Sequence, residues 1–239
     1  TRPATDQAKL DISAYEALYN NGNWVERGMA VREVIRHPSP ASFALIEKAA
    51  HDSHAGVRKE ALRGFRILKP RMALSTIMSM IENDPDYHVR LQALETLGHY
   101  RDPSSAIIFA TSLKNEDWLI RETAIKSLLM IDDYSIRYVS IPYILQALDD
   151  PVESVKIASL ENLKIRDARI YEKISDMFNE TPHYRHSLLV AQIKALKGYR
   201  LDEDTRTRMV DYLTHRNLDV RIAALKTLQE YTRIADNGK

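Results

Sequence analysis

A short residue pattern recurs seven times along this 239-residue chain. Its clearest copies run valine, arginine, two variable positions, alanine and leucine, as in residues 57–62, 89–94 and 220–225. The basic position, here called the arginine column, is occupied by Arg27, Arg58, Arg90, Arg121, Lys156 and Arg221, with Gln192 in the remaining copy. Neighbouring copies lie 29 to 36 residues apart. A period in this range is typical of helical repeats that stack into a solenoid.

Each repeat also contains a second amphipathic segment, so the sequence predicts paired helices. In the second repeat, Ser39 and Pro40 start a helix, and residues 55–68 form its partner with one apolar stripe. Pro70 ends that partner, because proline cannot extend the hydrogen-bond ladder. The same order returns downstream, which predicts about fourteen helices and no sheet. The expected repeats are residues 6–36, 37–69, 70–100, 101–133, 134–165, 166–200 and 201–235, in a single array over 1–239.

A second column lies six residues before the arginine column, in the turn between paired helices. It reads Asn21, Asp52, Asp84, Asn115, Asp150, His186 and His215. Such a residue can cap the second helix, and a carboxylate there can reach an arginine of its own or the adjacent repeat. We therefore interpret Asp52, Asp84 and Asp150, with the basic residues of the arginine column, as a structural ladder. Its weakest positions are expected in the sixth and seventh repeats, which carry histidine in the turn.

These two columns resemble those of HEAT repeats, and the short period is similar to the HEAT-like repeats of the phycobilisome-lyase type. The resemblance covers nearly the whole chain and implies an all-α fold, a right-handed α-α superhelix of about seven helix pairs. It implies little about function, because scaffolds, assembly factors, adaptors and a few enzymes share this architecture.

The resemblance further implies that the second helices line a concave face, which is the expected protein-binding surface. One column on that face lies five residues after the arginine column, and a neighbouring position adds one arginine. The predicted contact residues are Arg32, Arg63, Arg66, Glu95, Lys126, Glu161, Lys197 and Lys226. A mixture of charges of this kind suits a protein partner with a polar rim.

Composition excludes several other classes of protein. The formal net charge is +1, so no long-range field attracts polyanions. No apolar run approaches the roughly 18 residues of a membrane span. The chain lacks cysteine, which removes disulfides and thiolate chemistry, and on this basis we favour an extracytoplasmic over a cytoplasmic location. Because the sequence begins at Thr1 rather than methionine, we expect a processed or trimmed product.

No catalytic residue, cofactor or metal site is expected. The histidine pairs His51/His54 and His183/His186 lack a third nearby ligand. The leading hypothesis is a non-catalytic scaffold or adaptor for a protein partner of unspecified identity. A chromophore-lyase-like assembly factor is the main alternative. A HEAT-like nucleic-acid-binding protein is another, for which Trp118 beside Asp117 is the nearest local match, although nucleic acid is not the expected partner.

Overall fold

The computed structural model describes residues 12–237, and the side chains of residues 12–233. Over these residues the chain forms fifteen α-helices and three short 3-10 turns, with no strand. The chain divides into two compact modules, Thr1–Tyr100 and Arg101–Lys239, here called the N-terminal and C-terminal modules. The continuous seven-repeat array stays a prediction. None of the described helices is both long and apolar enough to cross a lipid bilayer.

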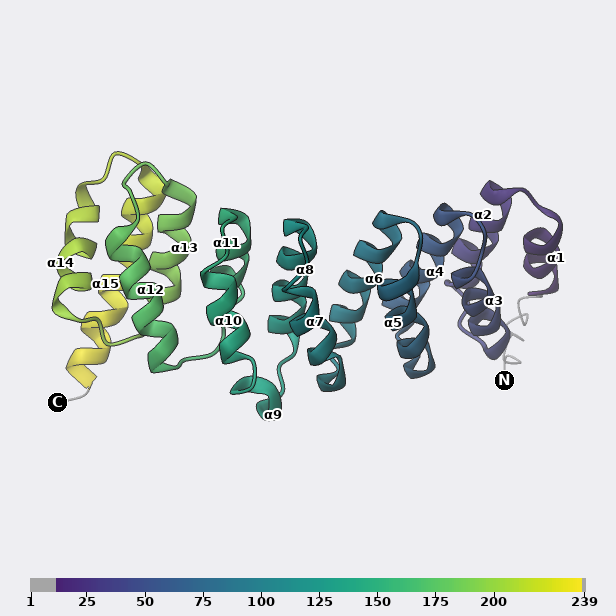
Figure 1. The fold of residues 1–239 in the computed structure, drawn as a ribbon, viewed down its shortest axis with the longest axis horizontal. Coiled ribbons are helices and arrows are strands. Elements are labelled where there is room, and N and C mark those ends of the chain that lie inside the picture. The colour runs from purple at the N-terminus through teal and green to yellow at the C-terminus, as the bar shows by residue number, and fades with distance from the viewer. Residues whose placement is uncertain (1–11, 238–239) are drawn as a thin grey trace, which may run out of the picture. The chain divides into compact units, whose positions relative to one another are not determined.

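The N-terminal module contains three helix pairs (Figure 1). They are α1 (Ser13–Asn21) with α2 (Trp24–Val34), α3 (Pro40–Ala50) with α4 (Ala55–Leu68), and α5 (Leu74–Asn83) with α6 (Tyr87–Tyr100), and the 3-10 turn Arg71–Ala73 precedes α5. The second helices pack in series, with α4 in contact with both α2 and α6. The predicted start of the first repeat, at residue 6, lies outside the described residues.

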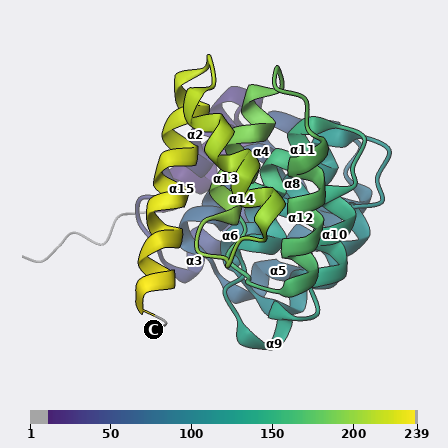
Figure 2. The ribbon, with the colours of Figure 1, turned by 90° about the vertical axis from the view of Figure 1, so that its left-hand side faces the viewer.

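The C-terminal module contains four pairs and one additional short helix. The pairs are α7 (Ala106–Ser112) with α8 (Trp118–Met130), α10 (Ile141–Leu148) with α11 (Glu153–Glu161), α12 (Ala168–Glu180) with α13 (His186–Leu196), and α14 (Glu203–Asp211) with α15 (Leu218–Asn237). The 3-10 turns Pro103–Ser105 and Tyr212–Thr214 adjoin α7 and α14, and α9 (Tyr134–Arg137) lies between the first two pairs. The second helices again contact one another in the order α8, α11, α13, α15. Figure 2 shows α15 beside α13 and α14.

The residues of the repeated pattern form the core between the two layers of each module. Val57, Ala61, Leu62 and Phe65 on α4 are buried, as their spacing predicts. At Gly64, also on α4, an added Cβ would lie 3.1 Å from the side chains of Ile35 and Ile46. The missing side chain therefore allows close approach of α4 to the preceding repeat. The expectation of an all-α fold of helix pairs is confirmed.

Candidate functional site

The arginine column joins successive repeats through bidentate ion pairs. Arg27 reaches Asp52, Arg58 reaches Asp84 and Arg121 reaches Asp150, with Nε–Oδ2 distances of 2.7, 2.7 and 2.6 Å. In each pair the carboxylate belongs to the repeat that follows the arginine. The remaining guanidinium nitrogen bonds to the turn of its own repeat, as when Arg58 Nη1 donates to the carbonyls of Asp52 and Ser53. One arginine thus connects two inter-helix turns.

Arg90 and Arg221 bond to the turns of their own repeats. Arg90 donates to the carbonyls of Asp84 and Pro85. Arg221 donates to those of His215 and Arg216. Lys156 shows no hydrogen bond or ion pair within the described side chains. The fully paired arginines are therefore those for which the next repeat belongs to the same module and carries aspartate in the turn column.

The turn-column residue does not cap the second helix, contrary to expectation. In five repeats its side chain accepts the backbone N–H two residues later, as Asp52 does from His54 at 2.8 Å. The cap is that later residue in three of the pairs: Asn23 caps α2, His54 caps α4 and Asp117 caps α8. Asp52 remains available to Arg27 because His54 has the capping role, whereas in the fifth repeat Val152 stands at this position and no side chain caps α11. Polar residues two positions after the turn column are the sequence signal that could have identified these caps.

The sixth repeat, in which Gln192 occupies the arginine column, is held by a different arginine. Gln192 is fully buried, and its Nε2 bonds Thr181 Oγ1 at 3.0 Å. Arg208, on α14, donates to the carbonyl of Asn179 in the last turn of α12 and to that of Thr181, the residue that follows α12. Its guanidinium also lies over the rings of Phe178 and Tyr212. A cation from a first helix therefore takes the place of the missing ladder arginine.

Two ladder carboxylates, Asp52 and Asp150, and Asp202, which caps α14, make stability depend on pH. Burial raises the pKa of Asp52, but hydrogen bonds from Arg27, the His54 backbone and Tyr19 outweigh burial and bring this pKa to about 2. Burial likewise raises the pKa of Asp202, and hydrogen bonds from Tyr171, Thr205 and Ser175 lower it to about 2. Burial raises the pKa of Asp150 as well, but hydrogen bonds from Arg121 and the Val152 backbone outweigh burial and lower it.

These carboxylates have lower pKa values in the folded than in the unfolded chain, so their ionised forms stabilise the folded state. This stabilisation is complete above about pH 4, the pKa of an aspartate in the unfolded chain, and is lost as the pH falls toward 2. We expect Asp52→Asn to lower the free energy of unfolding at pH 7 and to flatten its fall between pH of about 4 and 2. Urea titrations across this range measure both effects. Glu82→Gln, which changes an exposed carboxylate on α5, is the control. An equal pH slope in wild type and Asp52→Asn would contradict this account.

Three of the four predicted contact residues of the N-terminal module line one groove, and Arg32 lies outside its lining. Arg63, Arg66 and Glu95 line it, with Trp24, Lys59, Glu60 and Gln92 among the other lining residues. The arginines on this face of the module form ion pairs with carboxylates. Arg32 lies 2.5 Å and Arg63 3.3 Å from Glu60, and Arg66 lies 3.3 Å from Glu95. The charges of this surface are largely satisfied within the surface itself.

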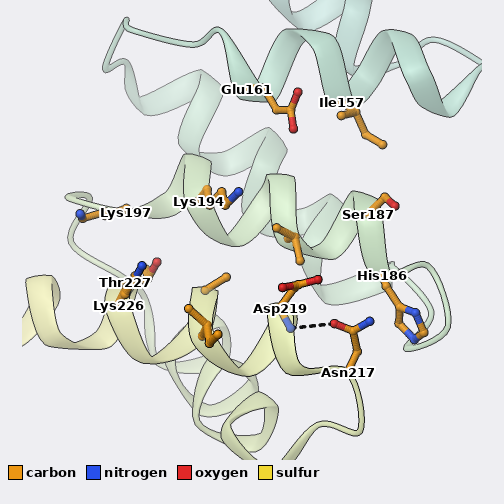
Figure 3. Close-up of a pocket in the computed structure, with 13 residues that line it drawn as sticks. Ile157, Glu161, His186, Ser187, Lys194, Lys197, Asn217, Asp219, Lys226 and Thr227 are labelled. Carbon is orange, nitrogen blue, oxygen red and sulfur yellow. Dashed lines mark hydrogen bonds between the residues drawn. The ribbon is translucent and has the colours of Figure 1, made fainter.

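A larger groove, of about 700 Å³, crosses the second helices of the C-terminal module. The groove lies over α11, α13 and α15, and three predicted contact residues, Glu161, Lys197 and Lys226, line it. Lys194, Asp219 and Asn217 add polar groups, and Ile157, Val190 and Ile222 add apolar ones. Figure 3 shows the lysines toward one end and His186, Asn217 and Asp219 toward the other. Lys126 lies outside this groove and is paired with Glu122 on its own helix.

The lysines of this groove differ from the arginines of the N-terminal module. Among the described side chains, Lys194, Lys197 and Lys226 have no carboxylate within ion-pair distance. Glu230, one turn after Lys226, pairs instead with Arg233 at 3.0 Å. Three exposed ammonium groups therefore share a groove whose lining holds two carboxylates, those of Glu161 and Asp219. This arrangement can attract an anionic group of a ligand.

The other candidate residues form no comparable site. Among the described residues, no group of three or more histidine or acidic side chains is placed to hold a metal ion. Trp118 is 44% exposed at the start of α8, and Asp117 beside it caps that helix. Tyr134 and Tyr138 are exposed on either end of α9, with their rings edge to face at 6.1 Å.

Comparison with known proteins agrees with this architecture. A family model described as HEAT repeats matches residues 74–164. The structure is similar to that of the Escherichia coli protein YibA, with a TM-score of 0.65 and 14% identity over 94% of this chain and 93% of that one. It is also similar to the complex of CpcE and CpcF of phycocyanin lyase from Nostoc sp. PCC7120, with a TM-score of 0.54 and 17% identity over 98% and 96%. No curated protein matches in sequence. At these identities the likeness concerns the fold.

Proposed function

We propose that this HEAT-like repeat protein is a non-catalytic scaffold that binds a protein partner on its second helices. One observation carries the proposal: the groove over α11, α13 and α15 combines partly exposed apolar side chains with lysines that have no carboxylate partner in the described structure. Apolar surface beside unsatisfied charge is typical of a protein interface with a polar rim. The ladder supports this role indirectly, since it keeps successive second helices in register.

Affinity capture with paired variants tests the proposal. The groove variant is Lys197→Glu/Lys226→Glu, and the control is Lys114→Glu/Arg216→Glu, which makes the same charge change at exposed positions of the same module outside the groove. We expect wild type and control to capture the same partner and the groove variant to lose it. Mass spectrometry of the three captures gives the result. Identical captures by all three would contradict the assignment of this face.

The chromophore-lyase-like alternative differs in chemistry, so a separate measurement decides it. The fold is similar to that of the phycocyanin lyase chains, and no residue of this chain is assigned a lyase role by that likeness. The protein is mixed with a bilin and an acceptor protein, and the visible spectrum is followed. We expect no change; a covalent adduct that forms only when this chain is present would overturn the non-catalytic part of the proposal.

A further inference from the structure

We infer that the groove over α11, α13 and α15 takes an acidic, amphipathic protein segment, an inference that rests on the proposed function and specifies its partner. The positive end of the groove extends beyond the three lysines. An adjoining pocket shares Glu161, Lys194 and Lys197 with the groove and adds Lys164 and Arg166. Arg166 lies over the ring of Tyr199, 4.8 Å from its centroid. Five cations and a single carboxylate therefore occupy one end of this surface.

The groove also offers apolar contact. Ile157, Val190 and Ile222 line it, and Ile222 is 40% exposed. On α15, Leu218 and Leu225 lie outside the groove lining, one helical turn on either side of Ile222, and are 57% and 49% exposed, so apolar surface continues beside the groove. A ligand that carried only charge would leave this apolar surface in water. A segment that alternates carboxylates with apolar side chains would cover both parts.

The two carboxylates of the lining favour a protein segment over nucleic acid. Glu161 lies on α11 and Asp219 on α15, so two of the helices that border the groove each carry a carboxylate (Figure 3). A nucleic-acid strand carries a phosphate at every step, so some phosphates would face these carboxylates. A protein segment can place its carboxylates at the lysine end only and neutral residues near Asp219. Charge complementarity of this kind gives specificity and accelerates association.

A labelled peptide tests the inference directly. The probe is a fluorescein-labelled synthetic peptide, Glu-Glu-Leu-Glu-Ser-Leu-Ser-Leu, whose carboxylates lie in one half only, and its binding to the full chain is followed by fluorescence anisotropy. We expect binding that weakens with added salt, since exposed charges are screened. The groove variant Lys197→Glu/Lys226→Glu should weaken binding by more than about tenfold, and the control Lys114→Glu/Arg216→Glu by less than about twofold.

Two matched probes separate the contributions, and a third tests the competing ligand class. A peptide with glutamine in place of glutamate should not bind, and one with serine in place of leucine should bind more weakly than the parent. Equal binding by the glutamine peptide, or equal loss in the groove and control variants, would overturn the inference. Tighter binding of a single-stranded DNA oligonucleotide of the same charge would also overturn it and assign the groove to nucleic acid.

The peptide titration and affinity capture fail in distinguishable ways. If the groove variant loses a captured protein but wild type does not bind the acidic peptide, the scaffold role stands and the partner chemistry proposed here is wrong. If the three captures are identical and the peptide binds equally to both variants, this face is not the binding surface. Circular dichroism of each variant establishes that it is folded before either measurement is interpreted.

Discussion

Replacing Asp84 with alanine is expected to lower the free energy of unfolding by about 3–5 kcal/mol, because it leaves the buried Arg58 guanidinium without its carboxylate. Both side chains are more than nine-tenths buried, and two hydrogen bonds of 2.7 Å join them. The substitution also removes the acceptor for the Asp86 backbone N–H. Urea denaturation followed by circular dichroism measures the change.

Glu95→Ala is the matched control. It removes an exposed ion pair, Arg66–Glu95, that also joins neighbouring repeats of the same module. Exposed pairs contribute little because water screens them, so the expected loss is below about 1 kcal/mol. If Asp84→Ala cost no more than Glu95→Ala, the ladder would not be the stabilising connection between these repeats.

Arg208→Met is expected to lower the free energy of unfolding by about 2–4 kcal/mol, since it removes charged hydrogen bonds to two backbone carbonyls. Methionine keeps an apolar chain against Phe178 and Tyr212, so the loss reports mainly on the guanidinium. Arg206→Met changes an exposed arginine on the same helix and should alter the free energy by less than about 0.5 kcal/mol. Equal effects of the two substitutions would show that Arg208 does not replace the ladder arginine missing at Gln192.

The repeat register explains why much of the fold could be predicted from the sequence. Apolar residues at helical spacing define the buried stripes, and proline and capping residues define the breaks, so the helix pairs follow from local patterns. The partners of Arg27, Arg58 and Arg121 were within reach of the same reasoning, because the turn column repeats with the arginine column. Whether each arginine pairs with the aspartate of its own repeat or of the next could be decided only from the three-dimensional structure.

The remaining features depend on contacts that the register does not encode. Arg208 lies on a first helix and belongs to neither column, so its contact with the turn of the preceding repeat has no periodic signal. The pairing of charges on the predicted contact surface likewise has no periodic signal. Arg32 and Arg66 find carboxylates on neighbouring helices, whereas Lys197 and Lys226 find none among the described side chains. All four of these cations were predicted on one surface, and the sequence did not distinguish those with a carboxylate partner from those without one.

We expect the arginines between repeats to stabilise the fold and the lysines of the groove to recognise the partner. Measuring peptide affinity and the free energy of unfolding on the same two proteins, Arg208→Met and Lys197→Glu/Lys226→Glu, tests this division within one module. We expect Arg208→Met to lose stability and, where folded, to keep wild-type affinity for the acidic peptide. The lysine variant should keep its stability and lose affinity. The reverse pattern, with affinity lost in Arg208→Met and stability lost in the lysine variant, would show that this division of roles is wrong.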